Sequence, residues 1–219
     1  MLIGDLMTRD VVSVRSDTPL KEVASLLIEH GIGGVPVIDG DGVVLGIVSE
    51  SDFVFKELGR AYVRQSRLAR LFGRPNPDSA KVEAMTAGEV MTTPAVTIDG
   101  HVSFVREAAI LMSEHGVNRL PVTESGRLVG IITRSDVVRV FAQSDQVLEE
   151  RVRDAMRDVD GRLLERLAGG VVTLAGTVAT RELAETAVDV ARAVDGVVAV
   201  NAERLVWTEA GAGASPSLR

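Results

Sequence analysis

One segment of this 219-residue chain occurs twice, and the repeat limits the fold more than any other feature. Gly46–Val54 (GIVSESDFV) returns as Gly130–Val138 (GIITRSDVV), and upstream Met7-Thr8 returns as Met91-Thr92. Two copies are too few for a solenoid, so we expect a pseudo-symmetric pair. Each copy ends in a turn with the pattern hydroxyl-x-Ser-Asp, so the chain contains two copies of any binding site that this turn forms. This favours a paired binding module over a single catalytic cleft.

The composition and charge exclude several classes of protein. An apolar content of 46% is enough for one large or two small globular domains. The net charge of -7 argues against non-specific nucleic-acid binding, and the lack of cysteine excludes disulfides and thiolate chemistry. The first residues lack a basic export region, and we find no apolar run long enough to span a membrane. We therefore expect a soluble cytoplasmic protein that does not bind nucleic acid.

The first copy has the pattern of a β-α-β-β-α unit. A short strand near Val11–Val14 precedes Thr18, which we expect to cap a helix that ends at Gly31. Two strands follow, Val35–Ile38 and Val43–Val48, and Asp52 opens the next helix. The second copy repeats this order, with a cap at Ser103, a helix end at Gly116, strands at Leu120–Val122 and Leu128–Thr133, and a helix from Asp136.

This unit, with the pattern G-h-h-[ST]-x-[ST]-D at its end, resembles the cystathionine-β-synthase (CBS) domain. The resemblance covers residues 2–56 and 86–143. It implies an α/β fold in which two CBS motifs pack as a pseudo-twofold pair. It also implies that the clefts between the motifs bind an adenosine-containing ligand, such as AMP, ADP, ATP or S-adenosylmethionine.

The chemistry of the repeated turn agrees with such a ligand. The carboxylate of Asp52 or Asp136 can accept hydrogen bonds from both hydroxyls of a ribose, and the neighbouring hydroxyl side chains can donate to phosphate. Backbone N–H groups at the start of a helix favour a nearby anion. The alternative interpretation is that each aspartate only caps the helix that follows it.

The resemblance implies two clefts, each built from both copies. One cleft takes Thr133, Arg134, Ser135 and Asp136 together with Thr18, Val23, Ile32 and Gly33. The other takes Ser49, Ser51 and Asp52 together with Ser103, Ala108, Val117, Asn118 and Arg119.

The two predicted clefts differ in charge. Glu50 lies inside the first turn where Arg134 lies in the second, which favours phosphate at the Asp136 turn. Arg119, however, belongs to the Asp52 cleft and favours phosphate there. The sequence does not rank the two clefts.

The last third of the chain has the order α-β-β-α-β. Helix Gln146–Val159 precedes an apolar stretch, Leu163–Leu167, and a strand, Val171–Val178; Thr180 can cap a second helix, and Val197–Val206 is a final strand. On one face of that second helix we place Leu183, Ala187, Val190, Ala191 and Val194. The pattern resembles the BON domain, a small α+β domain associated with membrane attachment. Acidic residues outnumber arginines here, which weakens attraction to anionic lipid, so a protein partner is an equally good interpretation.

We therefore divide the chain into residues 1–73 (first CBS motif with a basic helical extension), 74–85 (linker), 86–144 (second CBS motif), 145–208 (BON domain) and 209–219 (disordered tail). The extension, Lys56–Arg74, carries six basic residues and one acidic residue. It is either a solvated surface helix or a set of arginines that reach a ligand phosphate or an acidic partner.

Enzymatic patterns are absent from the sequence. His30, His101 and His115 do not have metal-ligand spacing, and no phosphate-loop or dinucleotide fingerprint occurs. The Ser-Asp turns lack a histidine base placed by sequence. We expect no catalytic residue, no metal site and no required cofactor, although Mg²⁺ would be compatible with ATP as the ligand.

These patterns together predict a non-catalytic regulatory protein, a homodimer by resemblance, that binds an adenosine-containing ligand and signals through its BON domain. The alternative is a structural adaptor with empty CBS clefts, whose BON domain binds a protein or a membrane surface. In that case the protein would be peripheral to a membrane.

Overall fold

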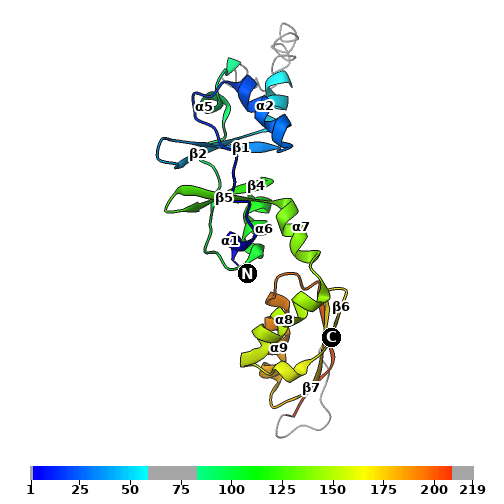
Figure 1. The fold of residues 1–219 in the computed structure, drawn as a ribbon. Coiled ribbons are helices and arrows are strands. Elements are labelled where there is room, and N and C mark those ends of the chain that lie inside the picture. Colours follow the sequence, from blue (N-terminus) through cyan, green and yellow to red (C-terminus); the bar gives the residue numbers. More distant parts are fainter. Residues whose placement is uncertain (1, 59–82, 209–219) are drawn as a thin grey trace, which may run out of the picture. The chain divides into compact units, whose positions relative to one another are not determined.

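A computed structural model describes residues 2–58 and 83–208 (Figure 1). Most of the predicted basic extension and linker, and all of the predicted tail, lie outside these residues. The chain divides into two compact units. The repeat unit contains Leu2–Ser103 and Glu107–Thr133, and the C-terminal unit contains Phe104–Arg106 and Arg134–Arg219.

The first copy forms a helix packed against a two-stranded hairpin. Strand β1 (Gly34–Ile38) pairs antiparallel with β2 (Val44–Ser49), and Val14 adds a parallel bridge to Val37. Helix α2 (Leu20–His30) places its apolar face on the hairpin, and residues 50–58 are helical after β2. Its core contains Val14, Leu20, Val23, Leu27, Val35, Val37 and Val48.

The second copy repeats this arrangement. Strands β3 (Ile98–Asp99), β4 (Arg119–Glu124) and β5 (Arg127–Thr133) form a sheet in that order, with β3 parallel and β5 antiparallel to β4. Helix α6 (Val105–Glu114) corresponds to α2. In register, Val122 pairs with Gly130 as Val37 pairs with Gly46, and a bulge follows each pair. The predicted pseudo-symmetric pair is therefore confirmed.

The predicted helix ends are confirmed, but one predicted cap is wrong. Gly31 (φ 61°) and Gly116 (φ 64°) adopt the left-handed conformation that follows a helix. The Thr18 hydroxyl accepts a hydrogen bond from the Arg15 N–H (3.0 Å) and makes no cap to α2, which follows Pro19 directly. Thr18 therefore tightens the preceding turn instead of satisfying the helix N–H groups.

The two copies are interlocked through their leading segments. Thr8 exchanges two backbone hydrogen bonds with Ile131 (2.9 Å each), and Thr92 exchanges two with Ile47 (2.9 and 3.1 Å). The short helices α1 (Ile3–Leu6) and α5 (Ala87–Val90) precede these threonines and contact β5 and β2, respectively. Figure 1 shows α1, in blue, beside β5. Each copy is thus completed by a segment from the other.

The glycine that begins each repeated segment lies against the Met-Thr pair of the other copy. A Cβ at Gly46 would lie 2.6 Å from the Met91 sulfur and 2.9 Å from the Thr92 carbonyl oxygen. A Cβ at Gly130 would overlap the Met7 side chain in the same way. The Met-Thr pair of each copy therefore packs on the glycine of the other copy, which explains why both are repeated together.

The C-terminal unit begins with α7 (Arg134–Phe141) and contains a small α+β domain. Helices α8 (Asp145–Ala155) and α9 (Arg181–Ala193) pack against the sheet β6-β7-β8 and against each other. The strands are β6 (Leu164–Ala168), β7 (Val171–Val178) and β8 (Ala199–Trp207), with two short 3-10 turns, η2 (Met156–Asp158) and η3 (Gly161–Leu163), before β6. The buried core includes Val152, Met156, Leu174, Ala187, Leu205 and Trp207.

The predicted order of these elements is confirmed, with one error in a helix face. The Thr180 hydroxyl accepts a hydrogen bond from the Leu183 N–H (3.2 Å), as a cap should. Leu183, however, is 41% exposed, while Ala184 and Val188 are buried. The buried face of α9 is therefore the face that carries Ala184, Ala187 and Ala191. These small side chains let the helix approach the sheet closely.

Asp145, at the start of α8, holds the tight turn between β6 and β7. Its carboxylate accepts hydrogen bonds from the N–H groups of Gly169 (2.7 Å) and Gly170 (2.9 Å), both at positive φ. These bonds from Gly170 and Gly169 lower the pKa of Asp145 because they stabilise its ionised form.

We predict that Gly46→Ala destabilises the repeat unit by about 1–3 kcal/mol, because the new methyl group overlaps Met91 and a backbone carbonyl. Urea denaturation followed by far-UV circular dichroism measures this effect. Gly40→Ala is the matched control, because a Cβ there meets no atom within 4 Å. Equal urea midpoints for Gly46→Ala and Gly40→Ala would contradict the conclusion that close packing against Met91 requires glycine at position 46.

We predict that Asp145→Asn lowers the stability of the BON-like domain at pH 7 and flattens its pH dependence. A depressed carboxyl pKa contributes stability above about pH 4, the unfolded value, and this is lost as the pH falls through the folded pKa. Trp207 is the single tryptophan and is buried in this domain, so its fluorescence reports unfolding here. The exposed Asp189→Asn is the control; a variant at Asp145 with the wild-type pH profile would refute the assignment.

Candidate functional site

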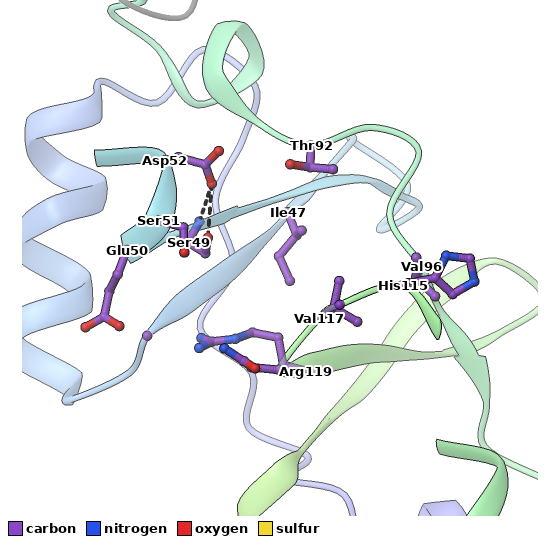
Figure 2. Close-up of a pocket in the computed structure, with 13 residues that line it drawn as sticks. Ile47, Ser49, Glu50, Ser51, Asp52, Thr92, Val96, His115, Val117 and Arg119 are labelled. Atoms are coloured by element: carbon purple, nitrogen blue, oxygen red, sulfur yellow. Dashed lines mark hydrogen bonds between the residues drawn. The ribbon is translucent and has the colours of Figure 1, made fainter. Parts of the chain in front are cut away.

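The repeat unit contains a pocket of about 320 Å³ between the two copies (Figure 2). This volume lies at the low end for small-molecule sites, so the pocket is large enough for one small ligand. The first copy contributes Gly33, Ile47, Ser49, Glu50, Ser51 and Asp52, and the second contributes Thr92, Val96, His115, Gly116, Val117, Asn118 and Arg119.

The repeated turn of the first copy forms one wall. The Asp52 carboxylate oxygen Oδ2 accepts hydrogen bonds from the Ser49 N–H (2.9 Å) and the Ser49 hydroxyl (3.1 Å), drawn as dashed lines in Figure 2. Asp52 therefore does stabilise the start of the helix that begins at residue 50, as the alternative interpretation held. Its side chain is only partly buried and also lines the pocket, so the two roles are compatible.

The opposite wall is the loop that joins α6 to β4. Gly116 turns the chain, and Val117 and Asn118 lead to Arg119 at the start of β4. The guanidinium of Arg119 donates a hydrogen bond from Nη1 to the Gly34 carbonyl oxygen (3.0 Å). Burial lowers the pKa of Arg119, and the negative charge of Glu50 opposes this shift.

Two glycines make room for this arginine. A Cβ at Gly33 would lie 2.5 Å from Nη2 of Arg119 and 2.9 Å from Oε2 of Glu50. A Cβ at Gly34 would lie 2.9 Å from Nη1 of Arg119. Both charged groups therefore lie against the Gly33-Gly34 backbone, on the first-copy side of the pocket (Figure 2).

The repeated turn of the second copy is built differently. Asp136 is only 4% exposed, and its Oδ1 accepts a hydrogen bond from Arg139 Nη1 (2.7 Å), one turn further along α7. Phe55 takes the position of Arg139 in the first copy. Arg134 and Ser135 are exposed. The two aspartates that look equivalent in sequence thus have different surroundings.

The structure gathers six of the residues predicted for the Asp52 cleft, and they are Ser49, Ser51, Asp52, Val117, Asn118 and Arg119. Ser103 is exposed and does not line this pocket, while Ala108 has no exposed surface, so its side chain packs in the core. Gly33, predicted for the other cleft, lines this one. Sequence reasoning missed Ile47, Thr92, Val96, His115 and Gly116 as lining residues. The repeated Met-Thr pair was the one sequence feature that could have indicated a role for Thr92.

The predicted Asp136 cleft stays a prediction. Thr18, Ile32, Gly33 and Thr133 are half-buried residues of the repeat unit, whereas Arg134, Ser135 and Asp136 belong to the C-terminal unit. Val23, also predicted for this cleft, has no exposed surface and belongs to the core of the first copy.

Within residues 2–58 and 83–208, the structure holds no group of three acidic or histidine side chains that could bind a metal ion. None of the helices described there has the length and apolar character needed to cross a membrane.

Comparison with known proteins gives consistent matches along the chain. A model of the CBS domain matches residues 3–59 and 87–143, and a model of the BON domain matches residues 144–208. The uncharacterized protein MK0525 of Methanopyrus kandleri is 28% identical over 152 residues, which are 69% of this chain and 68% of that protein. The chloroplastic CBS domain-containing protein CBSX1 of Arabidopsis thaliana is 31% identical over 159 residues, 64% of each chain. The chain thus spans 68% and 64% of the length of these two relatives.

The fold is also similar to a solved structure. The crystal structure of CBSX2 of Arabidopsis thaliana in complex with AMP superposes with a TM-score of 0.51 at 29% identity, covering 65% of this chain and 96% of that one. The repeat, the interlocked α/β copies and these matches lead to one conclusion: this chain belongs to the CBS-domain family and consists of two CBS domains followed by a BON domain.

Proposed function

We propose that this protein is a non-catalytic regulator that binds an adenosine-containing ligand, such as AMP, ADP, ATP or S-adenosylmethionine, in the Asp52 pocket. The observation that carries the proposal is the pocket itself, which joins the Ser49–Asp52 turn of one CBS domain to Val117–Arg119 of the other. The similar structure of CBSX2, solved in complex with AMP, supports an adenosine ligand at a CBS pair.

The residues of the pocket fit the parts of such a ligand. Asp52 can accept hydrogen bonds from ribose hydroxyls, and Ser51 and Thr92 can donate hydrogen bonds to the ligand. Ile47 and Val117 offer apolar surface for a flat base. The Asp52 turn suits this role better than the Asp136 turn, because the Asp136 carboxylate is buried and bonded to Arg139.

We also propose that ligand binding is signalled through the BON domain, and that Asp195, which follows α9, takes part in it. Its side chain is 8% exposed, lies 3.8 Å from Arg151 and accepts a hydrogen bond from the N–H of Val105, the first residue of α6. Burial raises the pKa of Asp195, and Arg151 and the Val105 N–H oppose this shift.

Helix α6 leads along the chain to the pocket. It begins at Val105 and ends at Glu114, directly before the pocket residues His115–Arg119. A ligand that favours one position of this loop would also favour one arrangement of the CBS domains, and we propose that the BON domain, which follows them in the chain, responds to that arrangement. We also propose a homodimer, as the resemblance implies; the large apolar side chains of Ile28, Val54 and Leu58 are exposed in the first CBS domain.

We predict that one or more of AMP, ADP, ATP, S-adenosylmethionine and NAD raises the unfolding temperature, because a ligand that binds only the folded state must stabilise it. Asp52→Asn should then weaken binding about tenfold or more, since a hydrogen bond to a charged group is worth roughly 1.5–3 kcal/mol. Calorimetric titration measures the change.

Ser51 and Ser135 provide a matched pair for the same titration, because both are exposed and occupy equivalent turn positions. Ser51→Ala should weaken binding and Ser135→Ala should not. The reverse result would move the site to the Asp136 turn. No shift with any of the five compounds would favour the adaptor alternative, in which the BON domain binds a protein or a lipid surface.

We predict that a bound ligand changes amide hydrogen exchange at residues 104–106 and 194–198, and that Asp195→Asn reduces this change without weakening ligand binding. The amide side chain keeps the size of Asp195 but removes the charge that faces Arg151. The exposed Asp189→Asn is the control within the same domain. An equal ligand response in both variants would rule out Asp195 as the connection.

A further inference from the structure

The charged groups of the Asp52 pocket are unevenly balanced. Among the described residues that line it, Glu50 and Asp52 carry negative charge, Arg119 carries positive charge, and His115 is charged only when protonated. A ligand with several phosphates therefore meets two carboxylates and a single arginine.

That arginine is already engaged by the protein. Nη1 of Arg119 donates to the Gly34 carbonyl oxygen (3.0 Å), and Oε2 of Glu50 and Nη2 of Arg119 both lie within 3 Å of the Cβ position at Gly33. Burial lowers the pKa of Arg119, and the negative charge of Glu50 acts in the opposite direction. One donor of Arg119 is thus already used by a backbone carbonyl, and its guanidinium lies near the carboxylate of Glu50.

The repeat provides an internal comparison. Glu50 and Arg134 occupy the same position of the two turns, between the hydroxyl residue that ends the strand and the serine before the aspartate. Both side chains are exposed, so neither is needed to fill the core. Glu50 thus differs by two unit charges from its counterpart, at an exposed position that lines the pocket and can therefore act on a ligand.

We infer that Glu50 is a specificity-determining residue: it makes this pocket select adenosine compounds with no phosphate, or with one, against those with a long phosphate chain. The inference rests on the proposed adenosine site and names the ligand class for it. At a separation of about 8 Å, each added negative charge on the ligand lowers affinity roughly 2- to 30-fold, depending on the local dielectric.

The test is calorimetric titration of the full chain with adenosine, AMP, ADP and ATP, without Mg²⁺. The wild type should bind adenosine and AMP more tightly than ADP, and ADP more tightly than ATP. Glu50→Gln should raise the affinity for ATP about tenfold relative to adenosine, and Glu50→Arg, which copies the second turn, should raise it further. Glu22→Gln, on the exposed face of α2, is the control with the same change of charge and should leave the order unchanged.

Salt provides a readout that needs no variant. If repulsion from Glu50 is the stronger effect on the phosphates, a higher salt concentration screens it and improves ATP binding relative to adenosine binding. If attraction to Arg119 is stronger, a higher salt concentration weakens ATP binding, and this result would contradict the inference. ATP binding as tight as adenosine binding in the wild type, with no effect of Glu50→Gln, would overturn this inference and leave the adenosine site intact. A failure of all four compounds to bind would instead overturn the proposed function.

Discussion

The exchange of backbone hydrogen bonds between the two CBS domains is the interaction on which the rest of the repeat unit depends. Thr92 pairs with Ile47 and Thr8 pairs with Ile131, so neither hairpin is complete without a segment from the other domain. The pocket follows directly, since Thr92 and Ile47 both line it. The hydrogen bonds that join the domains thus also fix the distance between the two walls of the site.

Near the line that relates the two copies, equivalent residues face each other, and this limits what can be placed there. Gly34 and Arg119 begin the equivalent strands β1 and β4, and Arg119 donates its hydrogen bond to Gly34 itself. Two arginines at these positions would compete for one space and repel each other. One glycine and one arginine avoid this conflict, so the two copies differ at a position beside the pocket.

The order of elements could be predicted from the sequence, because apolar periodicity and helix-ending glycines are local signals. Gly31 and Gly116 ended their helices as expected, and Thr180 capped α9. Thr18 was misjudged as a cap because its hydroxyl found a nearer N–H group, that of Arg15. The interlock and the lining residues Thr92 and Val96 depend on pairing between distant segments, which periodicity does not encode. The repeat revealed two candidate turns that differ in charge, but only the structure shows that Asp136 is buried against Arg139 while Asp52 lines the pocket.

The different use of the two aspartates follows from their places in the chain. The Asp136 turn opens α7, which leads directly to α8 of the BON domain, and a helix in that position benefits from a carboxylate bonded to Arg139 in its first turn. In the Asp52 turn, Phe55 stands where Arg139 would be. Its aspartate stays at the pocket surface, beside the wall that α6 leads to. The repeat therefore supplies two similar turns, and we interpret one as the ligand site and the other as the start of the helix that leads to the BON domain.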